Sequence, residues 1–429
     1  MNTARIVIVF LAGLLAIGCA ASSPPWQPAT AQSFAKPLTM KEAIALAESQ
    51  DLLSAEWKAR QKAAGAAVRQ AWTPPNPTLN LAWEDVGLKD AAGASQSTSS
   101  VGVSYPVLFW ITRPWEIASA RHRQAAAEQT ILAEKRDLAI EVGTSWLDIS
   151  ALAQKERFAT DAVDEASDSL RFVSTERSLG DASSLDETRA EAEVLRARAE
   201  LADVVAAKRA AQLAFAFALG ADRPYFPDVS DAMPAKDESI PPAMMLPSTN
   251  GPAFPEVAAA RESMRAAQAD VTAEYMRILP LTDTQGSVLR KNSPDGMSNS
   301  YGVDVPIPLF DWNSAGIARA RAERLLASIG AERTRRQAAQ RLSANWENWK
   351  ASREKYLTLV TPLQEKSRSI GHAGQTLFEQ GEISYADYLQ SRRDATVDAL
   401  AAVDSWRDAR AAEWTLLCLV NGASDRASK

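Results

Sequence analysis

The sequence GDASSLD at residues 180–186 is matched by GEISYAD at residues 381–387, a spacing of 201 residues. In both stretches a glycine suits the left-handed end of a helix, and a serine three residues later can cap the start of the next helix. An aspartate three residues after each serine completes the capping signal. Each stretch therefore predicts a sharp turn between two helices.

A second pair of matched segments lies upstream of these turns. VGVSYP at residues 101–106 is matched by YGVDVP at residues 301–306, a spacing of 200 residues, and a Leu-Phe pair follows each segment. Because the two spacings agree within one residue, we interpret the chain as a tandem duplication. Each half is predicted to run helix, two strands, very long helix, sharp turn, returning helix.

Long helices are expected to dominate both halves. We expect them at residues 39–71, 113–179, 184–219, 255–278, 313–379 and 384–420. A helix of sixty-odd residues, at a rise of 1.5 Å per residue, is a rod of about 100 Å. Apolar side chains spaced by four and three residues, as at Leu138, Val142 and Ile149, keep one face toward a partner helix. The rods are therefore predicted to fold back as coiled-coil hairpins.

Two pairs of short strands precede the rods, and their period-2 alternation allows two interpretations. A soluble sheet packed on a core gives the same pattern as a membrane barrel. Polar, glycine- and serine-rich loops at Val86–Ser99 and Arg290–Asn299, suited to extracellular tips, favour the barrel. The third strand, near Thr282–Leu289, alternates poorly. Aromatic side chains gathered where strands meet helices also favour the barrel; they are Phe109, Trp110, Trp115, Phe310 and Trp312.

Four strands cannot close a membrane barrel on their own, because the smallest such barrels have about eight. Copies of the chain must therefore share one barrel, and three copies would supply twelve strands. The predicted fold class is mainly α with a small β part. It combines long α-helical coiled-coil hairpins with four strands per protomer that contribute to a trimeric twelve-stranded transmembrane β-barrel.

The N-terminus carries signals for export. Residues 1–18 contain Arg5 followed by an apolar run too short to span a bilayer, which is typical of a signal peptide. Cys19 ends a sequence similar to the lipobox of bacterial lipoproteins, which predicts its acylation. The alternative is ordinary cleavage after ATA at residues 29–31. We divide the sequence into a signal peptide (1–18), a lipidated extension (19–37), a first repeat (38–225), a proline-rich connector (226–254), a second repeat (255–422) and a tail (423–429).

The side chains that hydrolytic, redox or metal chemistry would use are scarce. The cysteines are Cys19 and Cys418 and the histidines are His122 and His372, which predicts neither a disulfide framework nor a metal site. We find no nucleophile or phosphate-binding loop, so neither an enzyme nor a cofactor is expected. The net charge of −6, with acidic and basic residues interleaved along the helices, argues against a nucleic-acid partner.

Four motifs carry a resemblance to a known family. They are LTMKEAI at 38–44, PNP at 75–77, PIPLFD at 306–311 and the turn at 381–387, and in this order they make the sequence similar to TolC-like outer membrane efflux proteins. The resemblance implies a passive exit duct in the outer membrane with a periplasmic extension. It also implies a homotrimer that receives solutes from an inner-membrane efflux pump through a periplasmic adaptor protein. WED at 83–85 resembles the branch that serves heavy-metal cation exporters.

The resemblance also implies roles for individual residues. Asp387 matches an acidic position of the inner helix pair at the periplasmic aperture, and Asp186 matches the partner position on the other pair. The alternative for both aspartates is helix capping alone. Ile383 stands where some relatives carry a basic residue that helps to lock the entrance. The hairpin-tip residues expected to contact the adaptor are Gly180, Asp181, Gly381 and Glu382.

Two other classes of protein remain as alternatives. A periplasmic adaptor also has a helical hairpin and a lipid anchor, but it would normally show one hairpin flanked by glycine-rich β modules. A purely structural coiled-coil lipoprotein would lack the duplicated strands and the connector. The two hairpins and duplicated strands of this sequence favour the duct.

Overall fold

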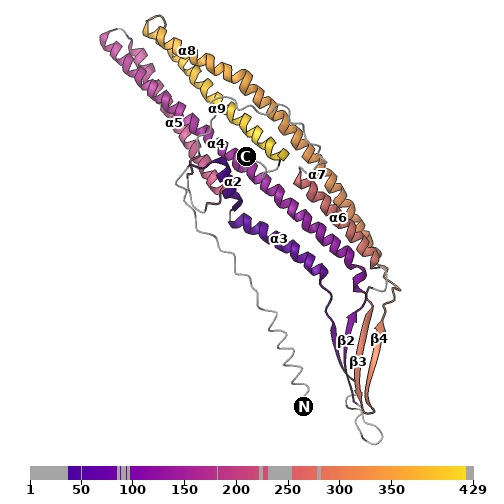
Figure 1. The fold of residues 1–429 in the computed structure, drawn as a ribbon. Helices are drawn as coiled ribbons and strands as arrows, with labels where there is room; N and C mark the ends of the chain where they lie inside the picture. Colours follow the sequence, from indigo (N-terminus) through magenta and orange to yellow (C-terminus); the bar gives the residue numbers. More distant parts are fainter. Residues whose placement is uncertain are drawn as a thin grey trace.

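The computed structural model describes residues 37–49, 51–84, 87, 93, 97–180, 182–221, 226–229, 254–277 and 282–421. The signal peptide, Cys19, Asp181, the C-terminal tail, and most of the connector and of the loop Val86–Ser99 lie outside these residues. Two helical hairpins extend toward one end of the molecule and a small sheet extends toward the other (Figure 1). The predicted fold, mainly α with a small β part, is confirmed.

The first half follows the predicted order of elements. They are α2 (Met40–Ser49), α3 (Asp51–Trp72), β1 (Thr78–Glu84), β2 (Thr98–Pro106), a short 3-10 turn (Phe109–Ile111), α4 (Arg113–Leu179) and α5 (Ser184–Ala218). The rod α4 has 67 residues, which corresponds to about 100 Å. Pro114 lies in its first turn, where a backbone N–H has no acceptor within the helix, so the absence of this group in proline costs no helical hydrogen bond.

The second half repeats this order with a single helix before its strands, without the short 3-10 turn and with an interrupted rod. Its elements are α6 (Pro255–Met276), β3 (Gln285–Ser293), β4 (Gly296–Asp304), α7 (Ser314–Glu354), the π-helical turn η2 (Lys355–Val360), α8 (Thr361–Glu379) and α9 (Tyr385–Asn421). The prediction of one α-helix over residues 313–379 was therefore wrong in detail. The rod widens at η2, immediately before Pro362, which has no N–H to donate to an α-helical partner.

The sheet has four antiparallel strands in the order β1-β2-β3-β4. The register pairs Leu81 with Val101 and Gly102 with Leu289. Pairing between β3 and β4 continues to Ser293 and Gly296, so the prediction of a loop at Arg290–Asn299 was wrong. These polar residues pair because two residues, Pro294 and Asp295, suffice for the turn. Gly296, which follows the turn and begins β4, adopts a φ of 124° that only glycine tolerates readily.

The largest hydrophobic cluster lies midway along the rods, where α2, α4, α5 and α9 meet. Trp146 of α4 is buried there beside Phe215 of α5 and Trp406 of α9. The Trp146 indole Nε1 donates to the backbone oxygen of Leu38 at 2.9 Å. The Leu38 N–H in turn donates to the oxygen of Asp228 at 2.9 Å. The start of the described chain is therefore fixed to the middle of the first rod.

Candidate functional site

The two hairpin tips lie at the same end of the molecule, opposite the sheet (Figure 1), and are built alike. Each preceding helix ends at a glycine with positive φ, 92° at Gly180 and 74° at Gly381. The Ser183 hydroxyl donates to Asp186 Oδ2 at 2.6 Å and accepts from the Asp186 N–H at 3.2 Å. Ser384 and Asp387 repeat both contacts at the same distances. The predicted capping at both turns is confirmed.

The tips differ in charge. The Asp186 carboxylate pairs with Arg189 at 3.3 Å, whereas the equivalent residue after Asp387 is Gln390, which donates to Asp394 at 2.8 Å. Within the part of the chain that the structure describes, no basic side chain forms an ion pair with Asp387. Asp387 is exposed, as are Gly180, Gly381 and Glu382. The second tip therefore presents an uncompensated carboxylate to solvent.

An aromatic cluster joins the two hairpins just behind the tips. The Phe378 ring of α8 stacks on Tyr388 of α9, with centroids 5.0 Å apart, and meets the edge of Phe172 of α4 at 5.6 Å. The Tyr385 hydroxyl lies 3.0 Å from Ser169 Oγ on α4. Burial raises the pKa of Tyr385, so its phenol stays protonated. Ile383 packs against this cluster and supplies an apolar contact instead of a charge.

Ion pairs connect α9 with the first hairpin along its length. Arg393 pairs with Glu193 of α5, and Arg392 pairs with Glu165 of α4. Burial opposes ionisation of the Glu193 carboxyl, but hydrogen bonds and charge from Arg393 and Arg196 outweigh it and lower its pKa. Two further pairs, Lys155 with Asp404 and Arg407 with Asp148, lie nearer the middle of the rods.

Two grooves flank the Arg392–Glu165 pair. One has a volume of about 360 Å³ and lies between α4, α5 and α9. The other has a volume of about 220 Å³ and lies between α4, α8 and α9. Small side chains of α4 line the first groove, including Ala159, Ala162 and Ala166. The two hairpins are therefore packed tightly at their tips and loosely behind them.

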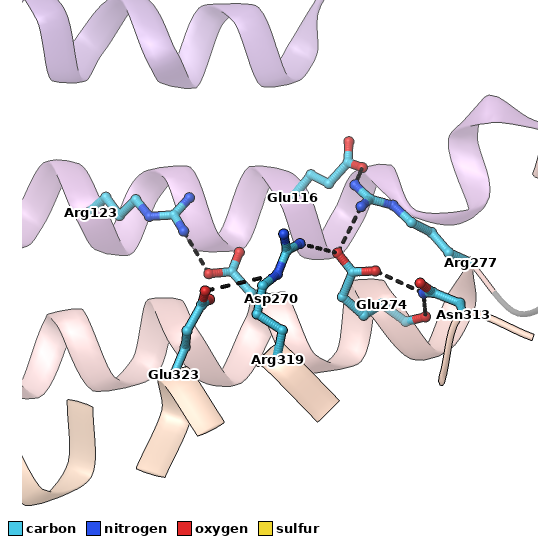
Figure 2. Close-up of polar contacts among 8 residues, drawn as sticks. All are labelled: Glu116, Arg123, Asp270, Glu274, Arg277, Asn313, Arg319 and Glu323. Atoms are coloured by element: carbon cyan, nitrogen blue, oxygen red, sulfur yellow. Dashed lines mark hydrogen bonds and ion pairs between the residues drawn. The ribbon is translucent and has the colours of Figure 1, made fainter. Parts of the chain in front are cut away.

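At the other end of the rods, Glu274 of α6 organises the junction with the strands (Figure 2). Asn313, the N-cap residue directly before α7, donates through Nδ2 to the Glu274 backbone oxygen at 2.9 Å and to Glu274 Oε2 at 2.8 Å. Asn313 has a φ of 54° and is the one non-glycine residue in the described ranges with positive φ. A Cβ on Gly316 would lie 2.2 Å from Asn313 Oδ1. Glycine is therefore required for this close approach.

The same junction joins α4 and α6 through charges (Figure 2). Arg277 contacts Glu274 at 2.8 Å and Glu116 of α4 at 3.0 Å. Arg123 of α4 contacts Asp270 of α6 at 2.6 Å. These residues were not predicted from the sequence, because their contacts join elements far apart in the chain. The available signal was an asparagine followed three residues later by glycine at the start of a rod.

The sheet exposes many apolar side chains. They are Leu79, Trp83, Val101, Val103, Val288, Tyr301 and Val303. Phe310, between β4 and α7, has 96% of its surface exposed, which adds to the apolar surface at the strand end of the molecule. Across the described residues, no helix combines the length and hydrophobicity that membrane crossing requires.

Comparison with known proteins identifies this architecture. The family model described as "Outer membrane efflux protein" matches residues 43–221 and 254–422. The chain belongs to the outer membrane efflux protein family. Membership of this family confirms the predicted efflux function and outer-membrane location for this outer membrane efflux protein.

Several relatives of this efflux protein have names that state a role. The cobalt-zinc-cadmium resistance protein CzcC of Cupriavidus metallidurans is 27% identical over 401 residues, which cover 90% of this chain and 91% of the relative. The nickel and cobalt resistance protein CnrC of the same species is 26% identical over 316 residues, 73% of this chain and 70% of the relative. The pyoverdine export outer membrane protein OpmQ of Pseudomonas aeruginosa is 26% identical over 312 residues, 66% of this chain and 62% of the relative.

Solved structures share the fold of this efflux protein. The outer membrane protein VceC from Vibrio cholerae has a TM-score of 0.71 at 16% identity, over 89% of this chain and 96% of VceC. CusC, whose structures concern folding and transmembrane channel formation, has a TM-score of 0.73 at 16% identity, over 94% of this chain and 99% of CusC. The fold of the efflux protein is therefore that of outer membrane channels.

Proposed function

We propose that the protein is the passive exit duct of a tripartite efflux system and acts as a homotrimer. The observation that carries this proposal is a four-stranded sheet whose outer strands, β1 and β4, have no further partner strand among the residues that the structure describes. Open edges are costly in lipid, because unpaired backbone groups find no water there. Three copies arranged edge to edge would pair every strand in a twelve-stranded barrel.

The helical end is proposed to face the periplasm and to receive the partners. Its two tips, at Gly180 and Asp181 and at Gly381 and Glu382, are the proposed contacts for a periplasmic adaptor protein, which connects the duct to an inner-membrane efflux pump. The described tip residues support this role because they are exposed while the side chains behind them are fixed. Asp387, which has no cationic partner among the described residues, is the proposed acidic residue of the aperture, with Asp186 on the outer helix pair.

Heavy-metal cations are the proposed cargo. The support is the similarity to CzcC, which extends over 90% of this chain, together with the similarity to CnrC. Both relatives are named for resistance to metals, the first to cobalt, zinc and cadmium and the second to nickel and cobalt. The relative named for pyoverdine export covers a smaller share of the chain, 66%.

Acylation of Cys19 is proposed to anchor the mature chain in the outer membrane. The 20 residues from Cys19 to Leu38 can span at most about 65 Å when extended. Leu38 is fixed at Trp146, and the 34 residues of α4 from there to Arg113 correspond to about 50 Å. The tether is therefore long enough for the lipid to reach the strand end of the molecule.

Two measurements test the proposal. Native mass spectrometry of the detergent-extracted protein should give a trimer, and a stable monomer with the same strand content would refute the shared barrel. Growth of a deletion strain in Zn²⁺, Co²⁺ or Cd²⁺ should be impaired and restored by the gene. If the protein is a trimer but its deletion leaves metal resistance unchanged, the proposal of a trimeric duct stands and the proposal of a metal cargo is rejected.

A further inference from the structure

The two faces of the four-stranded sheet differ in exposure. On β2, Val101 and Val103 are 54% and 47% exposed, whereas Ser100 and Ser104, which alternate with them, are buried. Val103 pairs with the exposed Val288 of β3. Because directly paired residues point to the same side of a sheet, the exposed apolar side chains share one face, called here the outer face. This is the face that would contact lipid in the proposed barrel.

Arg290 of β3 lies on the outer face and is exposed. It pairs with Val101 on one side and with Asn299 of β4 on the other. Along the described strands, Arg290 is the one charged residue at an outer-face position. The next residue, Lys291, points to the opposite face and pairs there with Glu84 at 3.1 Å. The outer face is therefore apolar apart from one cation and a few uncharged polar residues.

The Arg290 charge has no carboxylate partner among the described residues. Its polar contact there is from Nη2 to the Met297 sulfur at 3.6 Å, and a thioether is a weak acceptor. In the proposed barrel β4 would pair with β1 of the next copy. The outer-face side chains of β1 carry no charge; they are Leu79, Leu81 and Trp83. The guanidinium donors of Arg290 therefore remain available to a ligand outside the protein.

The position of Arg290 along the sheet is near the end farthest from the rods. β3 and β4 turn back after Ser293, at the opposite end of the sheet from the helices (Figure 1). From Asn299, the partner of Arg290, to the exposed Phe310 the chain advances by eleven residues. Extended backbone of this length covers about 27 Å along the axis of a barrel whose strands tilt by about 40°.

This distance matches the apolar band of a membrane barrel, which is about 25 Å tall. Arginine is costly at the centre of such a band and is tolerated at its edges, where the guanidinium reaches polar headgroups. Phe310 would then lie at the periplasmic edge of the band and Arg290 at the extracellular edge. The Arg290 side chain is therefore placed at the level of the lipid headgroups of the outer leaflet.

The surroundings of Arg290 fit a phosphate attached to acyl chains. A guanidinium donates two parallel hydrogen bonds to a phosphate, and the exposed amides of Asn299 and Asn292 lie beside it on the same face. Below these polar groups, Val101 and Val288 present apolar surface for acyl chains. In the outer leaflet of a bacterial outer membrane, lipid A combines a phosphorylated headgroup with acyl chains.

We propose that Arg290, with Asn292 and Asn299, binds a phosphate of lipid A on the outer face of the barrel, at one site per copy of the chain. This inference rests on the proposed function, because it requires the shared barrel and a helical end that faces the periplasm. It assigns to the sheet a binding site for a specific lipid in addition to its role as the wall of the duct.

Native mass spectrometry of the full-length detergent-extracted protein, titrated with lipid A, tests the site. The wild type should bind one lipid per copy, and Arg290→Gln should bind at least about tenfold more weakly, the loss expected for one charge-assisted contact. Arg290→Lys should bind with intermediate affinity, because lysine keeps the charge but not the planar fork. Lys291→Gln is the matched control and should bind like the wild type, since Lys291 points to the opposite face.

Three results would overturn the proposal. One is equal affinity of the wild type and Arg290→Gln, and another is an equal loss in Lys291→Gln, which would indicate a general effect of charge. The third concerns the ligand: lipid A treated with phosphatase should bind the wild type as weakly as lipid A binds Arg290→Gln, and undiminished binding would show that acyl chains alone are recognised.

Inorganic phosphate distinguishes a lipid from a free anion. A millimolar excess should leave lipid A bound, because the acyl chains contribute to the affinity. Complete displacement would show that the site binds a free phosphate ion and would reject the lipid.

The same spectra separate this inference from the proposed function. A monomer would refute the shared barrel and the lipid site together. A trimer that binds lipid A equally well with and without Arg290 would leave the trimeric duct in place and reject the lipid site alone. Because Arg290 is exposed, its variants should keep the mass of the trimer and its thermal midpoint.

Discussion

Arg393 on α9 donates to both carboxylate oxygens of Glu193 on α5, with its Nε 3.1 Å from each. The Glu193 side chain is only 18% exposed, so the pair is shielded from water more than a surface ion pair is. It joins the two hairpins just behind the aromatic cluster. Such contacts between the hairpins determine how firmly the tips stay together.

Replacing Glu193 with Gln should therefore loosen the tips. We expect a loss of about 1 kcal/mol, at the low end for a charged hydrogen-bonded pair because Arg393 is 40% exposed. Limited proteolysis of the tips and the thermal midpoint of the trimer measure the change. Glu191→Gln, at an exposed position on the same helix, should have little effect. Equal effects of the two changes would show that the pair contributes nothing specific.

The same pair predicts acid sensitivity. The folded-state pKa of Glu193 is lowered from 4.5, so its contribution is present above about pH 4.5 and is lost as the pH falls through the lower folded-state value. After correction for the intrinsic exchange rate at each pH, the amides of residues 385–393 should lose protection against hydrogen exchange below this pH in the wild type. The loss should be smaller in Glu193→Gln. Glu332 also has a lowered pKa, about 2, because of Arg335 and Arg336. It lies on α7, so its titration does not affect the exchange measured at residues 385–393. An equal loss of amide protection in both proteins would show that Glu193 is not the group responsible for the acid sensitivity.

Asp387→Asn should remove charge while preserving the cap, because an amide oxygen can accept the Ser384 hydroxyl as the carboxylate does. Cation preference and cation block in a planar bilayer should both fall, since like carboxylates near a threefold axis attract cations. Asp186→Asn should act more weakly, because Arg189 already compensates that charge. If conductance and block are unchanged and Asp387→Ala merely destabilises the trimer, the residue is a helix cap only.

The strand–helix junction should depend on Asn313 and Gly316. Asn313→Ala loses two contacts with Glu274 and places an alanine at positive φ, which should cost about 2 kcal/mol. Asn313→Gly should cost less, because glycine accepts this conformation. Gly316→Ala meets Asn313 at 2.2 Å, whereas Gly330→Ala on the same helix meets nothing within 4 Å. Thermal midpoints should fall for Gly316→Ala and stay level or rise for Gly330→Ala; the reverse order would contradict the close approach.

Lipid labelling tests the anchor. The wild type should incorporate labelled fatty acid and Cys19→Ala should not, whereas the buried Cys418 can be replaced by alanine without loss of label. Absent labelling of the wild type, with Gln32 as the mature N-terminus, would instead support cleavage after Ala31.

The sequence specified the helices well because their ends are local signals. Gly180 and Ser183 act through their own turn, and both were found where predicted. The π turn was not predicted, because the apolar spacing from Leu342 to Leu363 continues through it. The β3–β4 pairing was partly missed for a different reason. Its residues are exposed in one copy of the chain, so no buried face distinguishes Arg290–Asn299 from a polar loop.

The residues of the candidate site also differ in whether local sequence spacing predicts their contacts. The caps at Asp186 and Asp387 follow from spacing, and their geometry is confirmed. Their roles at an aperture stay predictions, since a single chain does not show the threefold axis. Glu274 could not be found from spacing, because its partner Asn313 is 39 residues away on another helix. Contacts of this kind become visible only when the elements are assembled.

The unequal charge of two otherwise matching tips has a consequence for stoichiometry. A trimer presents six tips of alternating kind, three with Asp186 neutralised by Arg189 and three with a bare Asp387. A partner that recognises the shared turn would bind with six copies per duct, in pseudo-sixfold symmetry. A partner that recognises the charge of Asp387 would bind with three copies per duct. The ratio of the two proteins in the assembled complex therefore reports which of these features the partner recognises.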